Sequence, residues 1–111
     1  MSDPASILDR LMTVIEDRKA NPPPRSYTSK LFVGGVPKIG EKITEEASEV
    51  VEAAGEDGDD GHAHLVHEAA DLVYHLLVML AYRNVRLSEV HDELAQRFGV
   101  SGIDEKESRQ S

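Results

Sequence analysis

Two stretches decide the fold of this chain: 38-KIGEKITEEASEVVEAA-54 and 67-HEAADLVYH-75. The first contains the acidic pattern E-E-x-x-E, at Glu45, Glu46 and Glu49. The second contains E-x-x-D, at Glu68 and Asp71. Both stretches are rich in helix-forming residues, and residues three or four apart share one face of a helix. If the two helices pack side by side, their carboxylates converge on one small volume.

Converging carboxylates predict a bound cation. Like charges that are buried close together without partners are costly. A hard divalent cation removes this repulsion, and an oxygen-only ligand set suits Mg²⁺ or Mn²⁺. The candidate metal ligands are Glu46, Glu49, Glu68 and Asp71. The alternative is a solvated acidic helix face, in which Lys42 and Glu46 form an ordinary pair one turn apart.

Helical spacing separates the acids of the first stretch. An apolar stripe predicts the core face of that helix, and it consists of Ile39, Ile43, Ala47, Val50 and Ala54. Glu46 lies nearest this stripe, and Glu45 lies further towards solvent, at about 100° per residue. The four carboxylates can hold two ions, or one ion while one acid acts as general base. Glu49 and Glu45 are the candidates for that base.

The composition excludes several classes of function. Lys and Arg total 12 against 21 Asp and Glu, a formal net charge of −9, which argues against binding to nucleic acid or an anionic membrane. The chain has no Cys, so disulfides, thiolate metal sites and thiol nucleophiles are excluded. No uninterrupted apolar run approaches the roughly 20 residues of a membrane span. The start, MSDPASILDRL, lacks the features of a signal peptide, and a soluble cytoplasmic protein is the default expectation.

The pattern of the whole chain predicts an all-α fold: an antiparallel bundle of four to five helices, completed by homo-oligomerisation. A chain of 111 residues is expected to form a single domain, residues 1–111. Helices are expected over 3–20, 26–34, 38–56, 62–84 and 88–98, with a polar tail over 99–111 and a turn over 55–61. The expected N-caps are Asp3, Ser26 and Ser88. The apolar face of 62–84 is wide enough to need more than one neighbour, and a partner subunit is one candidate.

Three lysines are candidate phosphate ligands: Lys30, Lys38 and Lys42. Each can contact a triphosphate as a positive charge. Lys42 is favoured because it lies one turn from Glu45 and Glu46 on the same face. A solvated lysine is the competing interpretation for Lys30 and Lys38.

Histidines are the only basic residues within reach of Glu68 and Asp71 along their own helix. His64 and His75 are therefore candidate nitrogen ligands. A packed or surface histidine fits both positions better, because oxygen ligands alone complete a magnesium site.

The motifs resemble those of the all-α NTP pyrophosphohydrolases, the MazG-like superfamily. More narrowly, residues 6–109 resemble the phosphoribosyl-ATP pyrophosphohydrolases. Besides the acidic pattern of 38–54, this narrower resemblance is carried by SYTSKLF at 26–32, EAADLVYHLLVML at 68–80 and SGIDEKESR at 101–109. The four-acid pattern alone is specific to the superfamily, and the other motifs point to the narrower family.

The resemblance implies an all-helical homo-oligomer, most simply a homodimer, with helices of two subunits near each site and Mg²⁺ as cofactor. It implies hydrolysis of phosphoribosyl-ATP to phosphoribosyl-AMP and pyrophosphate, between the α- and β-phosphates, as the second step of histidine biosynthesis. By position, the four candidate acids become the metal ligands, and Glu45 supports them by orienting a ligand or the attacking water. Two alternatives remain: a house-cleaning NTP or dNTP pyrophosphatase of the same fold, and a non-catalytic helical binding module whose acids are solvated.

Overall fold

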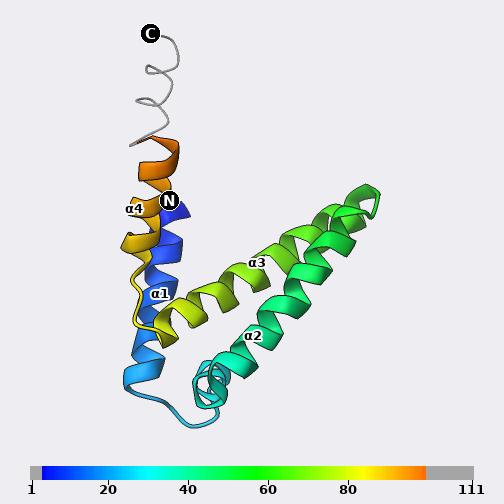
Figure 1. Ribbon diagram of the computed structural model, residues 1–111. Coiled ribbons are helices and arrows are strands. Elements are labelled where there is room, and N and C mark those ends of the chain that lie inside the picture. The colour runs from blue at the N-terminus through cyan, green and yellow to red at the C-terminus, as the bar shows by residue number, and fades with distance from the viewer. Residues whose placement is uncertain (1–3, 100–111) are drawn as a thin grey trace.

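The structure, a computed structural model, describes residues 4–99, and this part of the chain contains four helices and no strand. In chain order the helices are α1 (Pro4–Ala20), α2 (Tyr27–Ala54), α3 (Gly58–Tyr82) and α4 (Leu87–Phe98). Figure 1 shows α2 and α3 as a long antiparallel hairpin, with α1 and α4 at the end of the hairpin where α3 finishes. The all-α prediction is confirmed for these residues. The predicted cap Asp3 and the tail beyond Gly99 lie outside them.

Helix α2 joins two helices that the sequence pattern separates. Ser26 caps its start, and the Ser26 hydroxyl accepts a hydrogen bond from the backbone N–H of Ser29 at 3.2 Å. Gly35 kinks the helix with φ 67° and ψ −159°, a conformation that essentially only glycine adopts. A Cβ at this position would lie 3.1 Å from the hydroxyl oxygen of Tyr82. The kink therefore brings α2 close to the end of α3, and the two predicted segments form one bent element.

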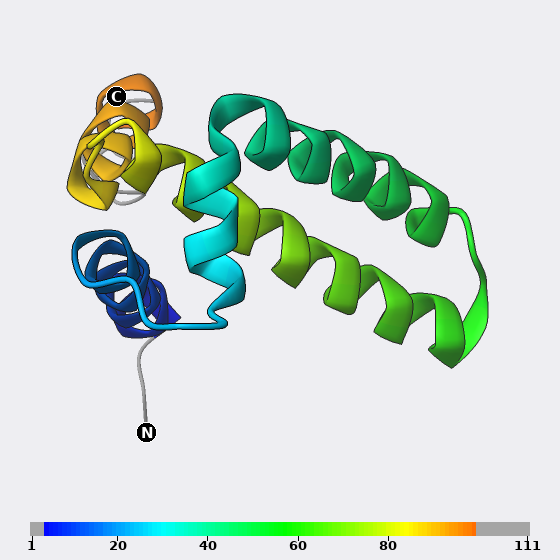
Figure 2. The same cartoon turned by 90° about the horizontal axis from the view of Figure 1, so that it is seen from below.

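The core lies where α1, the part of α2 on both sides of the Gly35 bend and the second half of α3 meet. The largest fully buried side chains come from all three helices, and they are Ile15, Leu31, Ile39 and Val78. Burying each of these side chains stabilises the fold by about 1.5–3 kcal/mol. Figure 2 shows the first segment of α2, in cyan, lying across α3. Phe32 of that segment stacks on Tyr82 of α3, with ring centroids 6.5 Å apart.

The outer half of the hairpin is only two helices thick, as Figures 1 and 2 show. Ala47 and Ala54, which were expected on the core face of α2, are exposed there. Val51 is 74% exposed and Val66 is 58% exposed. The prediction of a core face along the whole of α2 is therefore wrong for this half, because α3 is its only neighbour among the described residues.

The turn between α2 and α3 is shorter than the predicted 55–61. Helix α2 ends at Ala54 rather than at 56, and α3 begins at Gly58 rather than at 62. Two aspartates in the first turn of α3 stabilise this early start through the helix dipole. Gly61 permits the close return of the chain, because a Cβ there would lie 2.5 Å from the carbonyl oxygen of Glu56.

The connection between α3 and α4 also differs from the prediction. Helix α3 ends at Tyr82 rather than at 84, because Asn84 has a positive φ of 60°. Helix α4 begins at Leu87 rather than at 88, and its N-cap is Arg86 instead of Ser88. The Glu89 carboxylate accepts a hydrogen bond from the backbone N–H of Arg86 at 2.8 Å. This is the capping-box contact, in which the third helical residue binds the backbone N–H of the N-cap residue. Gly99 follows the last helical residue, as predicted.

Lys19 attaches α1 to the end of α3. Its Nζ donates hydrogen bonds to the carbonyl oxygens of Ala81 and Tyr82, at 2.8 and 3.1 Å, and to Oδ1 of Asn84 at 2.8 Å. Carbonyls in the last turn of a helix have no partner within the helix. Lys19 therefore provides hydrogen-bond donors for the terminal carbonyls of α3. It also places a positive charge at the negative end of the α3 dipole.

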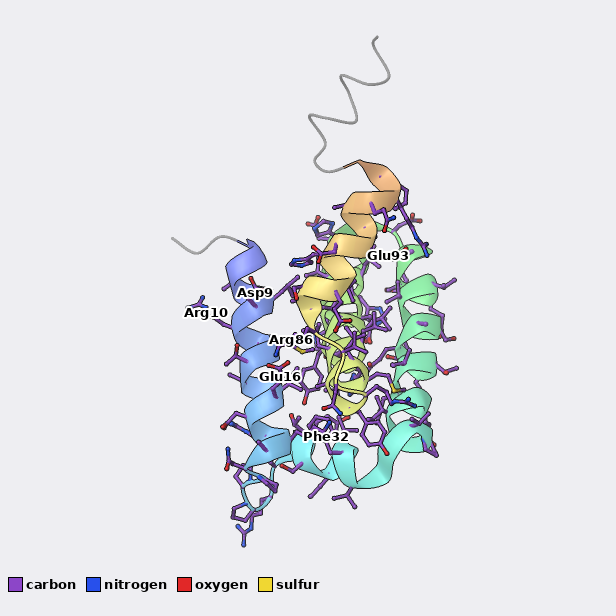
Figure 3. The ribbon with its side chains drawn as sticks, turned by 60° about the vertical axis from the view of Figure 1, so that its left-hand side comes forward. Asp9, Arg10, Glu16, Phe32, Arg86 and Glu93 are labelled. Carbon is purple, nitrogen blue, oxygen red and sulfur yellow. The ribbon has the colours of Figure 1, made fainter. Side chains whose placement is uncertain are left out.

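An open cavity of about 750 Å³ lies between α1 and the α3–α4 connection. Figure 3 shows Asp9 and Glu16 on the side of α1 that faces Arg86, whereas Arg10 points away. Asp9, Glu16 and Arg86 all line the cavity. None of the predicted site acids on α2 and α3 lines it, so the cavity is separate from the acidic cluster.

Helix α3 is the one described helix that is long and apolar enough to cross a membrane. A core helix of a soluble protein has the same length and composition. Helix α3 packs along α2 and carries Glu68, Asp71 and His75 near its middle. Ionisable side chains at the centre of a bilayer are costly, so we describe α3 as the core helix of the hairpin.

Candidate functional site

Glu46 and His75 form the most buried polar contact of the hairpin. The Glu46 side chain is 13% exposed and the His75 side chain 5% exposed. Oε1 of Glu46 lies 2.5 Å from Nδ1 of His75, while the same Nδ1 donates an aligned hydrogen bond to the carbonyl oxygen of Asp71 at 2.9 Å. On the other side of the ring, Nε2 lies 2.9 Å from the hydroxyl oxygen of Tyr27. Both ring nitrogens are thus occupied, and His75 is not placed to coordinate a metal.

Glu49 and Glu68 bring the two acidic motifs together across the hairpin. A proton shared with Glu68 is the main reason that the pKa of Glu49 is raised above its ordinary value, and repulsion from the Glu68 charge is the second reason. Partial burial and the nearby Glu45 charge act in the same direction. The two carboxylates are therefore close enough to repel each other, and a bound cation would relieve this repulsion.

His64 connects Glu68 to the end of α2. Its Nδ1 lies 3.0 and 3.1 Å from the two carboxylate oxygens of Glu56, and its Nε2 lies 3.3 Å from Oε2 of Glu68. The hydrogen bond with Glu56 is the largest cause of a raised pKa for His64. His64 therefore lies between Glu56 and Glu68, and the other Glu68 oxygen, Oε1, has no hydrogen-bond partner among the described residues.

His67, Glu68 and Asp71 form a group with the geometry of a metal site. One ligand atom from each of the three lies within 4.8 Å of the other two. His67 Nε2 also lies 3.3 Å from Oδ2 of Asp71. His67 is not among the ligands predicted from the sequence. Its position four residues before Asp71, on the same face of the helix, is the signal that identifies it.

The cluster has unsatisfied buried oxygens that fit a cation. Oε1 of Glu46 and Oε1 of Glu68 are buried and make no hydrogen bond with any part of residues 4–99. A buried carboxylate oxygen without a donor is costly. Glu46 of α2 contacts His75 of α3, and Glu49 of α2 faces Glu68 of α3. A hard divalent ion would satisfy the unpaired oxygens. The residues present therefore fit Mg²⁺ or Mn²⁺.

Glu45 and Lys42 lie at the exposed border of the cluster. The Glu45 side chain is 53% exposed, in agreement with its expected place on the helix, and its Oε2 lies 3.6 Å from Nζ of Lys42. The Tyr27 hydroxyl is the largest cause, and Glu45 the second, of a raised pKa for Lys42. Lys42 is therefore a cation at neutral pH.

Lys30 and Lys38 stand apart from these contacts. Both side chains are exposed. Neither makes a side-chain hydrogen bond or ion pair within the part of the chain that the structure describes. Of the three predicted phosphate ligands, the structure brings only Lys42 into contact with the acidic motif.

Comparisons with known proteins give the family. The family model of phosphoribosyl-ATP pyrophosphohydrolase matches residues 8–98. The chain is 52% identical over 102 residues to the phosphoribosyl-ATP pyrophosphatase of Rhodopirellula baltica, which covers 92% of this chain and 85% of that protein. It is 51% identical over 111 residues to that of Nitrosospira multiformis, covering 100% and 88%. It is 50% identical over 109 residues to that of Paramagnetospirillum magneticum, covering 98% and 97%.

The matched region contains all of α2 and α3 and therefore every acid of the cluster. Half of the residues are identical across almost the whole length of these relatives. This chain belongs to the phosphoribosyl-ATP pyrophosphohydrolase family.

Proposed function

We propose that this protein hydrolyses phosphoribosyl-ATP to phosphoribosyl-AMP and pyrophosphate, the second step of histidine biosynthesis, with Mg²⁺ or Mn²⁺ held between α2 and α3. Water adds to phosphorus, and the oxygen bridge between the α- and β-phosphates breaks. The family relationship supports the reaction. The observation that carries the site is the pair of buried, unpartnered carboxylate oxygens on Glu46 and Glu68.

In this proposal Glu46, Glu49, Glu68 and Asp71 hold the ion, and His67 is a further ligand candidate beside Asp71. A bound divalent ion neutralises phosphate oxygens and lowers the pKa of bound water. The chain supplies the geometry, because the hairpin fixes two acids on each helix and so orients the reacting groups.

Glu49 is the stronger candidate for the general base. It faces Glu68 across the hairpin, and it would act as the base in the arrangement where the other three acids hold the ion. Glu45 is exposed and paired with Lys42, which suits a role in orienting water or in holding Lys42. Lys42 contacts the phosphates as a fixed cation, and Lys30 and Lys38 are exposed and available to do so.

The exposed apolar surface of the hairpin supports a homo-oligomer, most simply a homodimer. The apolar side chains exposed to solvent on its two helices include Val51 of α2 and Val66, Val73 and Leu76 of α3. Exposed apolar side chains that gather on neighbouring helices are typical of an interaction site. A second copy of the chain would cover the thin half of the hairpin, and light scattering coupled to size exclusion measures its mass. The phosphorylated substrate and the lack of Cys are compatible with a cytoplasmic location.

Pyrophosphate release from a substrate panel tests the activity. Phosphoribosyl-ATP is compared with the NTPs and dNTPs, each with Mg²⁺ and with EDTA. Release from phosphoribosyl-ATP alone supports the proposal. Release from dNTPs instead means that the same acids serve a house-cleaning nucleotide pyrophosphatase. No release from any substrate means that the protein is a non-catalytic binding module.

A further inference from the structure

The histidines near the acidic cluster differ in what their ring nitrogens contact. His75 has both nitrogens occupied, and His64 lies between two glutamates. His67 instead directs its Nε2 towards Oδ2 of Asp71, at 3.3 Å, and its side chain is 70% exposed. His67 is therefore the histidine whose nitrogen lies beside a candidate metal ligand and is open to an ion arriving from solvent.

We infer that His67 gives this site a nitrogen donor, so that the group of His67, Glu68 and Asp71 binds a transition-metal ion such as Zn²⁺ or Co²⁺ in preference to Mg²⁺. The inference rests on the proposed metal site, because Glu68 and Asp71 belong to both. It adds the class of ion that the site selects, and it gives His67 a function that a magnesium site does not require.

The geometry of the three side chains fits one ion. They share a face of α3, since residues 67 and 71 are four apart and residues 68 and 71 are three apart. One ligand atom from each lies within 4.8 Å of the other two. Two ligands of a tetrahedral zinc ion lie about 3.3–3.5 Å apart, at metal–ligand distances of about 2.0–2.2 Å. The 3.3 Å between His67 and Asp71 equals this separation and exceeds the usual N–H···O distance of about 2.9–3.0 Å.

Glu68 distinguishes a cation site from an exposed ion pair. It is 7% exposed, and its Oε1 has no hydrogen-bond partner among residues 4–99. A simple pair between His67 and Asp71 would leave this buried oxygen unsatisfied, which is costly. An ion bound by all three side chains satisfies it. The buried oxygen therefore favours a bound cation over a surface contact.

The nitrogen donor decides which ion is preferred. Mg²⁺ takes oxygen ligands and keeps several of its waters. Imidazole suits zinc and other first-row transition metals, which bind N/O sites in a characteristic order of affinity. Removing the His67 imidazole should therefore weaken the binding of Zn²⁺ or Co²⁺ and leave the binding of Mg²⁺ nearly unchanged.

Two substitutions of His67 test the nitrogen directly. His67→Gln removes it and leaves an amide oxygen, which Mg²⁺ accepts. His67→Cys replaces it with a thiolate, which remains a transition-metal ligand. The chain has no Cys, so a thiolate-to-Co²⁺ charge-transfer band reports on the substituted position alone. His62 is also exposed on α3, and His62→Gln and His62→Cys are the matched controls.

The readout is metal binding to the full chain, which is prepared without an affinity tag, stripped with EDTA, dialysed and kept under a metal-free reductant. Co²⁺ affinity is measured by titration calorimetry, and Mg²⁺ binding by the rise in melting temperature. We expect His67→Gln to weaken Co²⁺ binding by about tenfold or more, because even outer partners of metal ligands affect affinity by that much. Its Mg²⁺-induced rise should match wild type. Co²⁺-loaded His67→Cys should show the charge-transfer band, and both His62 variants should bind Co²⁺ as wild type does, without the band.

Circular dichroism establishes that each variant is folded, as expected for a side chain that is 70% exposed. Equal Co²⁺ affinity in wild type and His67→Gln would show that His67 is not a ligand, while Mg²⁺ binding would still support the proposed metal site. Equal losses of Co²⁺ and Mg²⁺ binding would show that His67 maintains the site without selecting the ion. Absence of the band in His67→Cys would also overturn the inference. If the wild type binds neither ion, the proposed metal site fails and the selectivity falls with it.

Discussion

Replacing Gly35 with alanine tests whether the bend in α2 is built into the backbone. Gly35 has φ 67° and ψ −159°, in a region that is essentially restricted to glycine. An alanine Cβ would also lie 3.1 Å from the Tyr82 hydroxyl oxygen, so that tyrosine must shift by a few tenths of an ångström. We expect Gly35→Ala to destabilise the protein for both reasons.

The magnitude follows from the backbone. Holding a non-glycine residue in such a conformation costs about 1–3 kcal/mol. The lower entropy of the unfolded alanine chain offsets roughly 0.4–1 kcal/mol of this cost, while the contact with Tyr82 adds to it. A net loss of about 1–2 kcal/mol corresponds to a fall in melting temperature of roughly 4–16 °C for a domain of this size.

Gly40→Ala is the matched control, because it makes the same change in the same helix. At Gly40 the nearest atom to a new Cβ is Cε of Met79, at 3.9 Å, an ordinary contact. Alanine in a helix interior is favoured over glycine by roughly 0.5–1 kcal/mol, so Gly40→Ala should raise the melting temperature. Both proteins are melted at one protein concentration, because association shifts the midpoint. A Gly35→Ala protein as stable as Gly40→Ala would refute the left-handed bend.

Two further predictions concern Lys19 and Glu49. Lys19→Met should lower the free energy of unfolding by about 1.5–3 kcal/mol, measured by urea denaturation, because three hydrogen bonds to the end of α3 are lost; an unchanged midpoint would contradict this attachment of α1. The raised folded-state pKa of Glu49 contributes stability that is complete below its ordinary value of 4.5 and is lost as the pH rises through the raised value. In EDTA, Glu49→Gln should therefore gain in melting temperature relative to wild type as the pH rises from about 4.5, and Mg²⁺ should stabilise the wild type more at pH 7.5 than at pH 5. A difference between the two proteins that does not change with pH would show that Glu49 and Glu68 do not share a proton.

The positions of the helices could be predicted because local signals mark them. The prolines after Asn21 and the glycine at 99 end helices through backbone chemistry that the sequence displays directly. Helical periodicity also distinguished Glu46, which is largely buried, from the exposed Glu45. At Gly35 the sequence predicted the end of one helix and not a bend within a longer one, because the angle of the bend depends on packing against Tyr82.

The contacts of the histidines could not be predicted in the same way. The partners of His75 come from both segments of α2 as well as from its own helix, and their arrangement depends on the bend. His67 was not predicted as a ligand, although it lies one turn before Asp71 on the same face of the helix. The exposure of Ala47 and Ala54 could not be predicted either. Periodicity shows which face of a helix is apolar, but it does not show whether another part of the same chain packs on that face.

The central claim is that the carboxylates of α2 and α3 hold a divalent ion for the hydrolysis of phosphoribosyl-ATP. The most direct measurement is the initial rate of pyrophosphate release from phosphoribosyl-ATP against Mg²⁺ concentration, for wild type, Glu68→Gln and the exposed-surface control Glu52→Gln. Gln is isosteric and removes the charge repulsion with Glu49, so Glu68→Gln should remain folded by circular dichroism. We predict that its rate falls by about 100-fold or more, while Glu52→Gln matches the Mg²⁺-dependent wild type. A Glu68→Gln enzyme with the wild-type rate, or a wild-type rate that EDTA does not reduce, would contradict the account.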